Sequence, residues 1–372
     1  MSLFRGIADD MKLQDWLTKF IFPAEAKNVD REFVRWGTRL AVLEMALSGT
    51  TTYTDMYYFE DTVAEVTKQA GLRGVLGESV IGFPAPDYKT PQASLAATEQ
   101  FFKQYAHDPL IVPAVAPHAI YTVPNDVLQA SRALANRYQK PLLIHLAETK
   151  TENDEALAKR KMTPTAALES LGVLNGWTVA AHGVWLNDGD LAILKRRGTG
   201  LAHNPSSNMK LASGVAPVVK ILGLGIAMGL GTDGVAGSNN DHNMMEEMDL
   251  AAKLQKVTTG DPRALPALQA FEMATIVGAR ALHLDTLIGS IEKNKRADMI
   301  TISLAEAHAV PLYNVYSQLV YALKGSDVTD VMVNGRPVVR DRRMLTLDAR
   351  TILLKAVEYK RRVEGSLAPH FQ

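Results

Sequence analysis

The chain has 372 residues, of which 47% are hydrophobic, and its 40 basic and 40 acidic side chains give a formal net charge of zero. A chain of this size and composition can bury a substantial core, so we expect a soluble globular protein with one or two domains. Charges of both signs are interspersed, and no stretch approaches the ~20 apolar residues of a membrane span. We therefore expect small-molecule partners, and neither nucleic acid nor membrane.

The sequence contains no cysteine. This excludes disulfides, thiolate nucleophiles and thiolate metal ligands, so any bound metal must be held by histidine and carboxylate groups. The amino terminus lacks the basic and then apolar pattern of a secretory signal. We predict a cytoplasmic protein, and we also expect a homo-oligomer.

Short apolar segments with polar residues at their carboxyl ends predict seven buried strands, over residues 51–56, 73–79, 110–122, 141–149, 178–183, 199–205 and 226–234. Helical patterns lie between them, for example over 94–106 and 125–139, and Asn125 and Asp126 are typical capping residues for the second of these. Alternating strands and helices predict a parallel (β/α) barrel. In such a barrel the functional residues follow the carboxyl ends of the strands.

A closed barrel of this kind needs eight strands, and the chain opens with predicted helices before its first strand at Thr51. After residue 295 the pattern changes to short strands with a hairpin signal at Asn334 and Gly335, and an amphipathic helix capped by Asp348 closes the chain. We predict an α/β fold of three parts. A TIM-like (β/α)8 barrel lacking its first strand covers 1–295, part of a small β-sandwich domain covers 296–345, and a C-terminal helix covers 346–372.

Polar side chains gather at the ends of the predicted strands, namely His118, His145 with Glu148, His182, His203 with Asn204, and Asp233. Imidazole and carboxylate groups suit Zn²⁺ or Fe²⁺, and a metal with an open position lowers the pKa of bound water to about 7. Glu148 could carry the proton beside such a metal. Any one of these histidines, taken alone, is better explained as a hydrogen-bonded structural residue, but one predicted rim brings all of them together.

Several ordered motifs carry a resemblance to a known family: "LLIHLAET", "VAAHGVWL", "LAHNPSSNMKLASG", "GLGTDG" and "IGSIEKNKRADM". Together they resemble the 5'-methylthioadenosine/S-adenosylhomocysteine deaminases of the amidohydrolase superfamily, over essentially the whole chain. Guanine deaminases, 8-oxoguanine deaminases and triazine chlorohydrolases share much of the pattern. The superfamily is therefore better specified than the substrate.

The resemblance implies a Zn²⁺ held by a His-x-His pair on the first strand, by His145 and by Asp233. It implies that His182 orients the attacking water and that Glu148 moves the proton to the purine ring, while Glu148 and Asp233 also face the substrate. Glu25 matches a carboxylate that accepts hydrogen bonds from ribose hydroxyls, and His118 matches a substrate contact. The implied reaction is addition of activated water at C6 of adenine, with loss of ammonia.

The His-x-His pair is absent from this sequence, in which residues 1–6 correspond to positions that normally follow that pair. Two explanations are open. Either the coding sequence begins upstream of Met1, which the retained site residues favour, or the chain is a truncated form with impaired activity.

Three functional hypotheses follow from the sequence. The leading one is deamination of 5'-methylthioadenosine, S-adenosylhomocysteine or adenosine. A free-base aminopurine deaminase or related hydrolase is the second, and it would leave Glu25 without a sugar to bind. The third is a catalytically impaired pseudoenzyme, motivated by the missing ligand pair. Turnover of adenine against methylthioadenosine separates the first two, and metal content with ammonia release tests the third.

Overall fold

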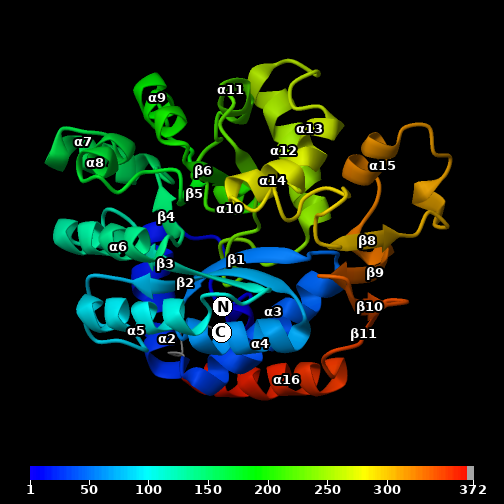
Figure 1. Ribbon diagram of the computed structural model, residues 1–372, viewed down its shortest axis with the longest axis horizontal. Helices are drawn as coiled ribbons and strands as arrows, with labels where there is room; N and C mark the ends of the chain where they lie inside the picture. Colours follow the sequence, from blue (N-terminus) through cyan, green and yellow to red (C-terminus); the bar gives the residue numbers. More distant parts are fainter. Residues whose placement is uncertain (367–372) are drawn as a thin grey trace.

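The computed structural model describes residues 1–366, and its centre is a curled sheet of seven parallel strands in the order β1 to β7 (Figure 1). The strands are β1 (Thr52–Tyr57), β2 (Arg73–Val80), β3 (Ile111–Pro117), β4 (Leu142–Leu146), β5 (Thr178–His182), β6 (Gly200–His203) and β7 (Met228–Leu230). Each pairs only with its neighbours in sequence, and in the described part of the chain β1 and β7 are not paired with each other or with an eighth strand. The prediction of a TIM-like barrel that lacks one strand is confirmed.

Helices cover the outer face of this sheet and connect its strands. They are α4 (Glu60–Ala70), α5 (Pro91–Gln104), α6 (Asn125–Tyr138), α7 (Lys150–Arg160), α8 (Pro164–Ser170), α9 (Asp188–Arg197), α10 (Pro205–Lys210) and α11 (Val218–Gly223). After β7 come α12 (Met244–Thr259), α13 (Ala267–Met273) and α14 (Ile276–Ala281), of which α14 packs on the inner face. The expected capping of α6 is wrong. Its N-cap is Pro124, and Asn125 instead accepts a hydrogen bond from Arg160, at 2.7 Å.

The two faces of the parallel sheet bury different sets of side chains. Residues such as Ile144, Ala180, Leu201 and Met228 belong to the large core shared with the crossover helices. Val75, Ala114, Ala116, Leu143 and Val179 form a separate cluster on the inner face, where Ala279 of α14 and residues 284 and 288 pack against them. Since side chains alternate between faces along a strand, this division shows which strand residues point inward.

The amino-terminal segment packs near the carboxyl ends of the strands. It contains a short 3₁₀ turn η1 (Ser2–Phe4), α1 (Leu13–Asp15), a π-helical turn η2 (Trp16–Ile21), α2 (Phe22–Asn28) and the long helix α3 (Arg31–Leu47). Three of its aromatic residues are buried: Phe4 and Phe33 pack together with ring centroids 4.7 Å apart, and the Trp16 indole donates to the carbonyl of Ala236. This contact ties the segment to the loop after β7.

A second sheet of four antiparallel strands lies beside the parallel sheet, in the order β11-β10-β9-β8 (Figure 1). Its strands are β8 (Met299–Ile302), β9 (Val328–Val333), β10 (Arg336–Arg340) and β11 (Arg343–Met344), with η3 (Ala307–Ala309), α15 (Val315–Tyr321) and η4 (Gly325–Asp327) between β8 and β9. Asn334 and Gly335 form the tight turn between β9 and β10 with positive φ at both residues, so the predicted hairpin is confirmed.

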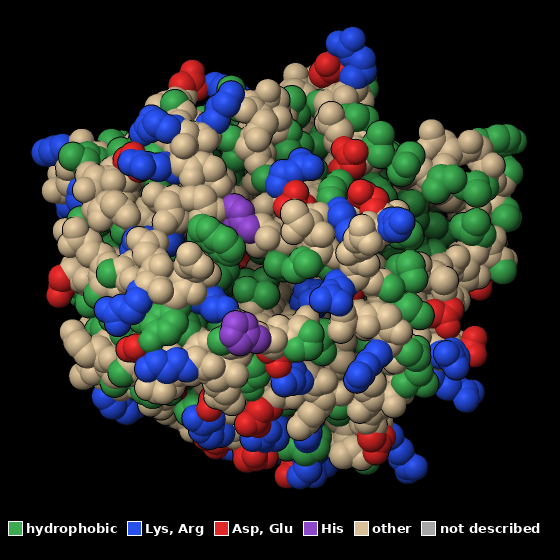
Figure 2. Space-filling view, viewed as in Figure 1, with side chains coloured by type: hydrophobic (Ala, Val, Ile, Leu, Met, Phe, Trp, Pro, Cys, Tyr) green, Lys and Arg blue, Asp and Glu red, His purple; other side chains and the backbone are tan. Residues whose placement is uncertain are grey.

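A buried ion pair joins the two sheets. Both guanidinium nitrogens Nε and Nη2 of Arg73 on β2 reach the carboxylate of Asp298, at 3.0 and 3.2 Å, and Asp298 also accepts from the amide of Asn334. Exposed apolar side chains gather around α15, which packs against α12 and α13 (Figure 2), among them Leu304, Val310, Leu312, Tyr313 and Val315.

The described part of the chain ends in α16 (Ala349–Ser366), which packs against α2 and α3. The prediction that Asp348 caps it is confirmed, because its carboxylate accepts from the amides of Arg350 and Thr351. The last part of the predicted C-terminal segment, residues 367–372, lies outside the described residues, as does His370. The domain boundaries given above stay a prediction. Within residues 1–366 no helix is both long and apolar enough to cross a membrane.

Candidate active site

A cavity of about 1030 Å³ opens along the inner face of the seven-stranded sheet, at the carboxyl ends of its strands. It brings together side chains from separate parts of the sequence that the motifs had singled out, namely Glu25, His118, His145, Glu148, His182, Asn204 and Asp233. Of the polar residues expected at the strand ends, His203 alone is not among the lining residues of this cavity within the described chain. The predicted convergence at one mouth is thus seen for the other six strand-end positions and for Glu25.

His145 lies at the end of β4 and is the best placed of the histidines to act as a ligand. Its Nδ1 lies 2.8 Å from the backbone carbonyl of His118, and because a carbonyl only accepts, Nδ1 carries the proton. The lone pair is then on Nε2. The ring stacks 5.5 Å from that of His182, at an interplanar angle of 21°, and lies 4.7 Å from that of His118.

His182 ends β5 and is almost completely buried. Its Nδ1 lies 3.0 Å from Oδ1 of Asn208, and its Nε2 lies 3.8 Å from Oε2 of Glu148. Because an amide oxygen only accepts, Nδ1 carries the proton, and the lone pair on Nε2 faces Glu148 and the cavity. Such an arrangement suits a neutral imidazole that accepts a hydrogen bond from a water molecule.

Glu148 follows β4 and is 4% exposed. Burial raises the pKa of this carboxyl to about 7; the nearby His145 opposes the rise and the carboxylate of Asp233 adds to it. A carboxyl group that titrates near neutrality can accept a proton and release it again within one catalytic cycle.

Asp233 follows β7 and has a left-handed backbone conformation, with φ of 61°. The Ser207 hydroxyl donates to Oδ2 at 2.6 Å, and the Gly234 amide donates to Oδ1 at 2.7 Å. These two bonds fix the carboxylate so that it faces the cavity lined by His145 and His182.

The cavity is also lined by Glu25, from α2, and by Tyr57, at the end of β1. Glu25 is 3% exposed and accepts a hydrogen bond of 2.7 Å from the Tyr57 hydroxyl. Burial raises the pKa of Glu25 to about 7, against the opposing effect of its tyrosine partners. His118 also lines the cavity; its Nδ1 lies 2.9 Å from the Thr122 hydroxyl, and burial lowers its pKa well below the ordinary value.

The prediction that His203 lies on the rim of the site is wrong. It is fully buried, neither ring nitrogen has a hydrogen-bond partner, and burial lowers its pKa to about 3. Alternation along β6 puts His203 on the same face as Leu201, which packs in the outer core. His182 would point outward by the same rule, but its φ of 75° turns the chain at the end of β5 and brings its ring into the cavity.

Three supporting residues were missed by the sequence reasoning: Tyr57, Ser207 and Asn208. Ser207 and Asn208 stand in the quoted motif "LAHNPSSNMKLASG", and their one-turn spacing from the strand end places both on α10. A helix that starts directly after a strand presents its first turn to the strand ends. That signal could have identified both residues, whereas Tyr57 carried no such signal.

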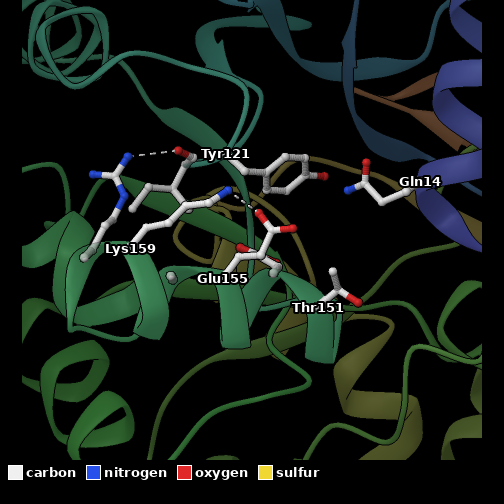
Figure 3. A pocket seen from close by; sticks show the side chains of 9 residues that line it. Gln14, Tyr121, Thr151, Glu155 and Lys159 are labelled. Atoms are coloured by element: carbon white, nitrogen blue, oxygen red, sulfur yellow. Dashed lines mark hydrogen bonds and ion pairs between the residues drawn. The ribbon is translucent and has the colours of Figure 1, made fainter.

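A second, smaller cavity of about 380 Å³ lies outside the first, between α7 and the amino-terminal segment (Figure 3). Tyr121 lines both cavities, and in Figure 3 its hydroxyl points toward Gln14. Glu155 and Lys159 on α7 form an ion pair of 2.7 Å along its edge. Tyr121 is therefore part of the wall between the site and the protein surface.

The donors around the main cavity fit a divalent metal in kind but not in number. His145 offers Nε2 and Asp233 a carboxylate oxygen, which are donors that Zn²⁺ prefers. However, residues 1–366 contain no group of three or more His, Asp or Glu side chains placed to hold one metal ion. His145 and Asp233 would therefore supply two of the ligands of a zinc site.

Comparison with known proteins identifies the family of this chain. Residues 1–338 match the Amidohydrolase family. The chain belongs to this family. It is 46% identical over 367 residues to 5-methylthioadenosine/S-adenosylhomocysteine deaminase 1 of Syntrophus aciditrophicus (strain SB), covering 99% of this chain and 83% of that protein.

Two further similarities bear on the site. The chain is 42% identical over 351 residues to a 5'-deoxyadenosine deaminase of Methanosphaera stadtmanae, covering 95% of this chain and 81% of that protein. Its fold matches the crystal structure of an adenosine deaminase from Xanthomonas campestris with bound zinc, with a TM-score of 0.96 and 37% identity over 98% of this chain and 83% of that one. The predicted resemblance is confirmed, while the predicted loss of an amino-terminal segment stays a prediction.

Proposed function

We propose that this chain catalyses the hydrolytic deamination of an adenine nucleoside to the inosine analogue and ammonia. The candidate substrates are 5'-methylthioadenosine, S-adenosylhomocysteine and adenosine. The observation that carries this proposal is the carboxyl of Glu148, whose pKa burial raises to about 7. It lies 3.8 Å from His182 Nε2 in a cavity that His145 and Asp233 also line. The named activities of similar proteins support the same reaction class.

A divalent metal, Zn²⁺ with Fe²⁺ as the alternative, completes the proposal. His145 and Asp233 would hold it as two of its ligands. When bound, such an ion lowers the pKa of water toward neutrality and so supplies a nucleophile. The remaining steps concern side chains of this chain.

Glu148 moves the protons. As a carboxylate it takes a proton from the attacking water and gives it to N1 of the adenine ring, while the water oxygen bonds to C6. It then transfers the second proton of that oxygen to the amino group. The C6–N bond breaks with its electron pair on nitrogen, and ammonia leaves. One water is consumed for each ammonia released.

His182 and Asp233 orient the attacking water. The Nε2 lone pair of His182 accepts a hydrogen bond from one proton of this water, which leaves the other proton to Glu148. The Asp233 carboxylate, which is fixed by Ser207 and Gly234, would act on the water from its place as a metal ligand. Both groups are buried or half-buried, so their hydrogen bonds face little competition from solvent.

Glu25 binds the sugar. Its carboxylate has more acceptor sites than the Tyr57 hydroxyl uses, so it can also accept from the 2'- and 3'-hydroxyls of a ribose. His118 lines the cavity with its ring 4.7 Å from that of His145, and it would contact the purine. This arrangement favours a nucleoside over a free base.

A substrate panel tests the proposal. The chain, supplied with Zn²⁺, is assayed for ammonia release from methylthioadenosine, S-adenosylhomocysteine, adenosine and adenine. We expect kcat/KM for the best nucleoside to exceed that for adenine by at least about tenfold, as the loss of buried hydrogen bonds would predict. Equal or faster turnover of adenine contradicts the proposed role of Glu25, and no turnover of any of the four contradicts the proposed activity of this chain.

A further inference from the structure

The segment between β4 and α7 presents Glu148 to the cavity, and its backbone is strained. Ala147 is fully buried and left-handed, with φ of 49°. A non-glycine residue in this region costs on the order of 1 kcal/mol or more, and it persists only where surrounding contacts impose it. The contacts that impose this turn therefore decide where the Glu148 carboxyl lies.

Hydrogen bonds hold this turn on both sides of Ala147. Its carbonyl accepts from the amides of Val184 and Trp185, at 3.0 and 2.9 Å, so the exit of β5 fixes one side. On the other side, the carboxylate of Glu152 accepts from the amide of Ala147 through Oε1, at 3.2 Å, and from that of Glu148 through Oε2, at 2.8 Å. One side chain thus binds both amides that precede the Glu148 side chain.

This arrangement differs from an ordinary helix cap. Thr149 is the N-cap of α7 and accepts from the amide of Glu152, at 3.1 Å. In a capping box the acid three residues later reaches back to the amide of the N-cap itself. Here Glu152 reaches one and two residues further, onto Glu148 and Ala147. The helix would be capped by Thr149 without these bonds.

The chemistry of the contact requires a carboxylate. Two amides donate to two different oxygens, and a glutamine would offer one acceptor and turn an N–H toward the second amide. The Glu152 side chain is also 6% exposed, so a charged group is kept there at a cost in desolvation. Burial raises its pKa to about 7. A residue that served only to begin α7 would need none of this.

We infer that Glu152 is a positioning residue for the reaction: its carboxylate fixes the backbone of Ala147 and Glu148 and so aims the Glu148 carboxyl at the reacting atoms. This inference rests on the proposed function, in which Glu148 moves the protons. Glu152 itself lies beside the outer cavity and touches no reacting group.

The test compares Glu152→Gln with Glu155→Gln, one turn along the same helix. Glu155 is exposed, and among residues 1–366 its ion-pair partner is Lys159, at the edge of the outer cavity (Figure 3). We expect Glu152→Gln to lower kcat for the best nucleoside by about tenfold or more with KM nearly unchanged, since small displacements of a catalytic group are costly. Glu155→Gln should match the parent. Glu152→Asp, which keeps the charge but is one methylene shorter, should lose kcat similarly.

A double-mutant comparison separates positioning from general damage. In a Glu148→Gln background, adding Glu152→Gln should cause no further loss of residual rate, because the group that it positions is already inactive. Hydrogen exchange supplies a readout independent of activity: the amides of Ala147 and Glu148 should exchange faster in Glu152→Gln and not in Glu155→Gln.

Two outcomes overturn the inference. One is an equal loss of kcat when Glu152→Gln is added to the parent and to Glu148→Gln, and the other is parent-like kcat and amide exchange in Glu152→Gln. A failure of the proposed function looks different: the parent would release no ammonia, or Glu148→Gln would retain the parental rate, while the exchange at Ala147 and Glu148 still responded to Glu152→Gln.

Discussion

Two carboxyls that line the central cavity, Glu148 and Glu25, are equally buried but have different surroundings. Glu148 and Glu25 are both less than 5% exposed, and burial raises the pKa of each to about 7. Glu148 lies among imidazoles and the carboxylate of Asp233, whereas Glu25 lies against tyrosine hydroxyls. Glu148 and Glu25 are therefore equally buried, but their neighbours suit them to different roles. A carboxyl beside groups that can donate and accept protons is suited to transfer them, and one held by a neutral hydroxyl is suited to accept hydrogen bonds.

Substitution of Glu148, which lies among the histidines, should have the largest effect on activity. Glu148→Gln keeps the shape of the side chain but cannot carry a proton, so kcat for deamination should fall by about 10²- to 10⁴-fold. Steady-state assays of ammonia release measure this, with Glu155→Gln as the matched control. A loss of less than about threefold would refute the proton-transfer role.

The pH dependence of stability tests whether both carboxyls are buried as described. Their folded pKa values are raised above the ordinary value, so their contribution to stability is fully present below pH ~4.5 and is lost as the pH rises through about 7. Replacing either by glutamine should reduce the fall in the free energy of unfolding between about pH 5 and pH 8 by on the order of 2 kcal/mol.

Denaturant unfolding of the metal-free protein at a series of pH values makes this measurement. Glu155→Gln serves again as the control, because that side chain is exposed. Parallel pH curves for the parent and both buried-site variants would show that these carboxyls are not desolvated.

Substitution of Glu25, which lies against tyrosine hydroxyls, should weaken substrate binding. The loss should depend on whether the substrate carries a sugar. Glu25→Gln removes acceptor sites for ribose hydroxyls, so kcat/KM for methylthioadenosine should fall by about tenfold, mainly through KM. Any slow turnover of adenine should not change. Equal losses for adenine and methylthioadenosine would show that Glu25 does not bind the sugar.

The smallest effect is expected at the partner of Glu25. Tyr57→Phe removes one hydrogen bond to Glu25 while keeping the ring, and the loosened carboxylate should raise KM for the nucleoside by about threefold with kcat unchanged. A fall in kcat as large as that in Glu148→Gln would mean that Glu148 and Glu25 do not have separate roles.

Two histidines show how much of the fold and of the candidate site the sequence could predict. The strand and helix alternation predicted all seven parallel strands, because buried parallel strands are continuously apolar and end in polar loops. The same reasoning treated His182 and His203 alike. Strand alternation sends both outward, and only the left-handed backbone of His182 reverses this, a feature that composition does not reveal.

The supporting contacts were harder to predict than the residues they support. Glu152 follows Glu148 at a spacing typical of helix starts, yet its bonds to Ala147 and Glu148 depend on a strained turn. Tyr57 and Glu25 are 32 residues apart and meet only because α2 packs over the end of β1. Such pairs require the three-dimensional arrangement.

Isotope labelling tests the central claim most directly. The chain is incubated with methylthioadenosine and Zn²⁺ in ¹⁸O-labelled water, and the products are analysed by mass spectrometry. Hydrolytic deamination predicts one ¹⁸O at C6 of an intact inosine analogue for each ammonia released. Release of free adenine, or an inosine analogue without ¹⁸O, would contradict the account.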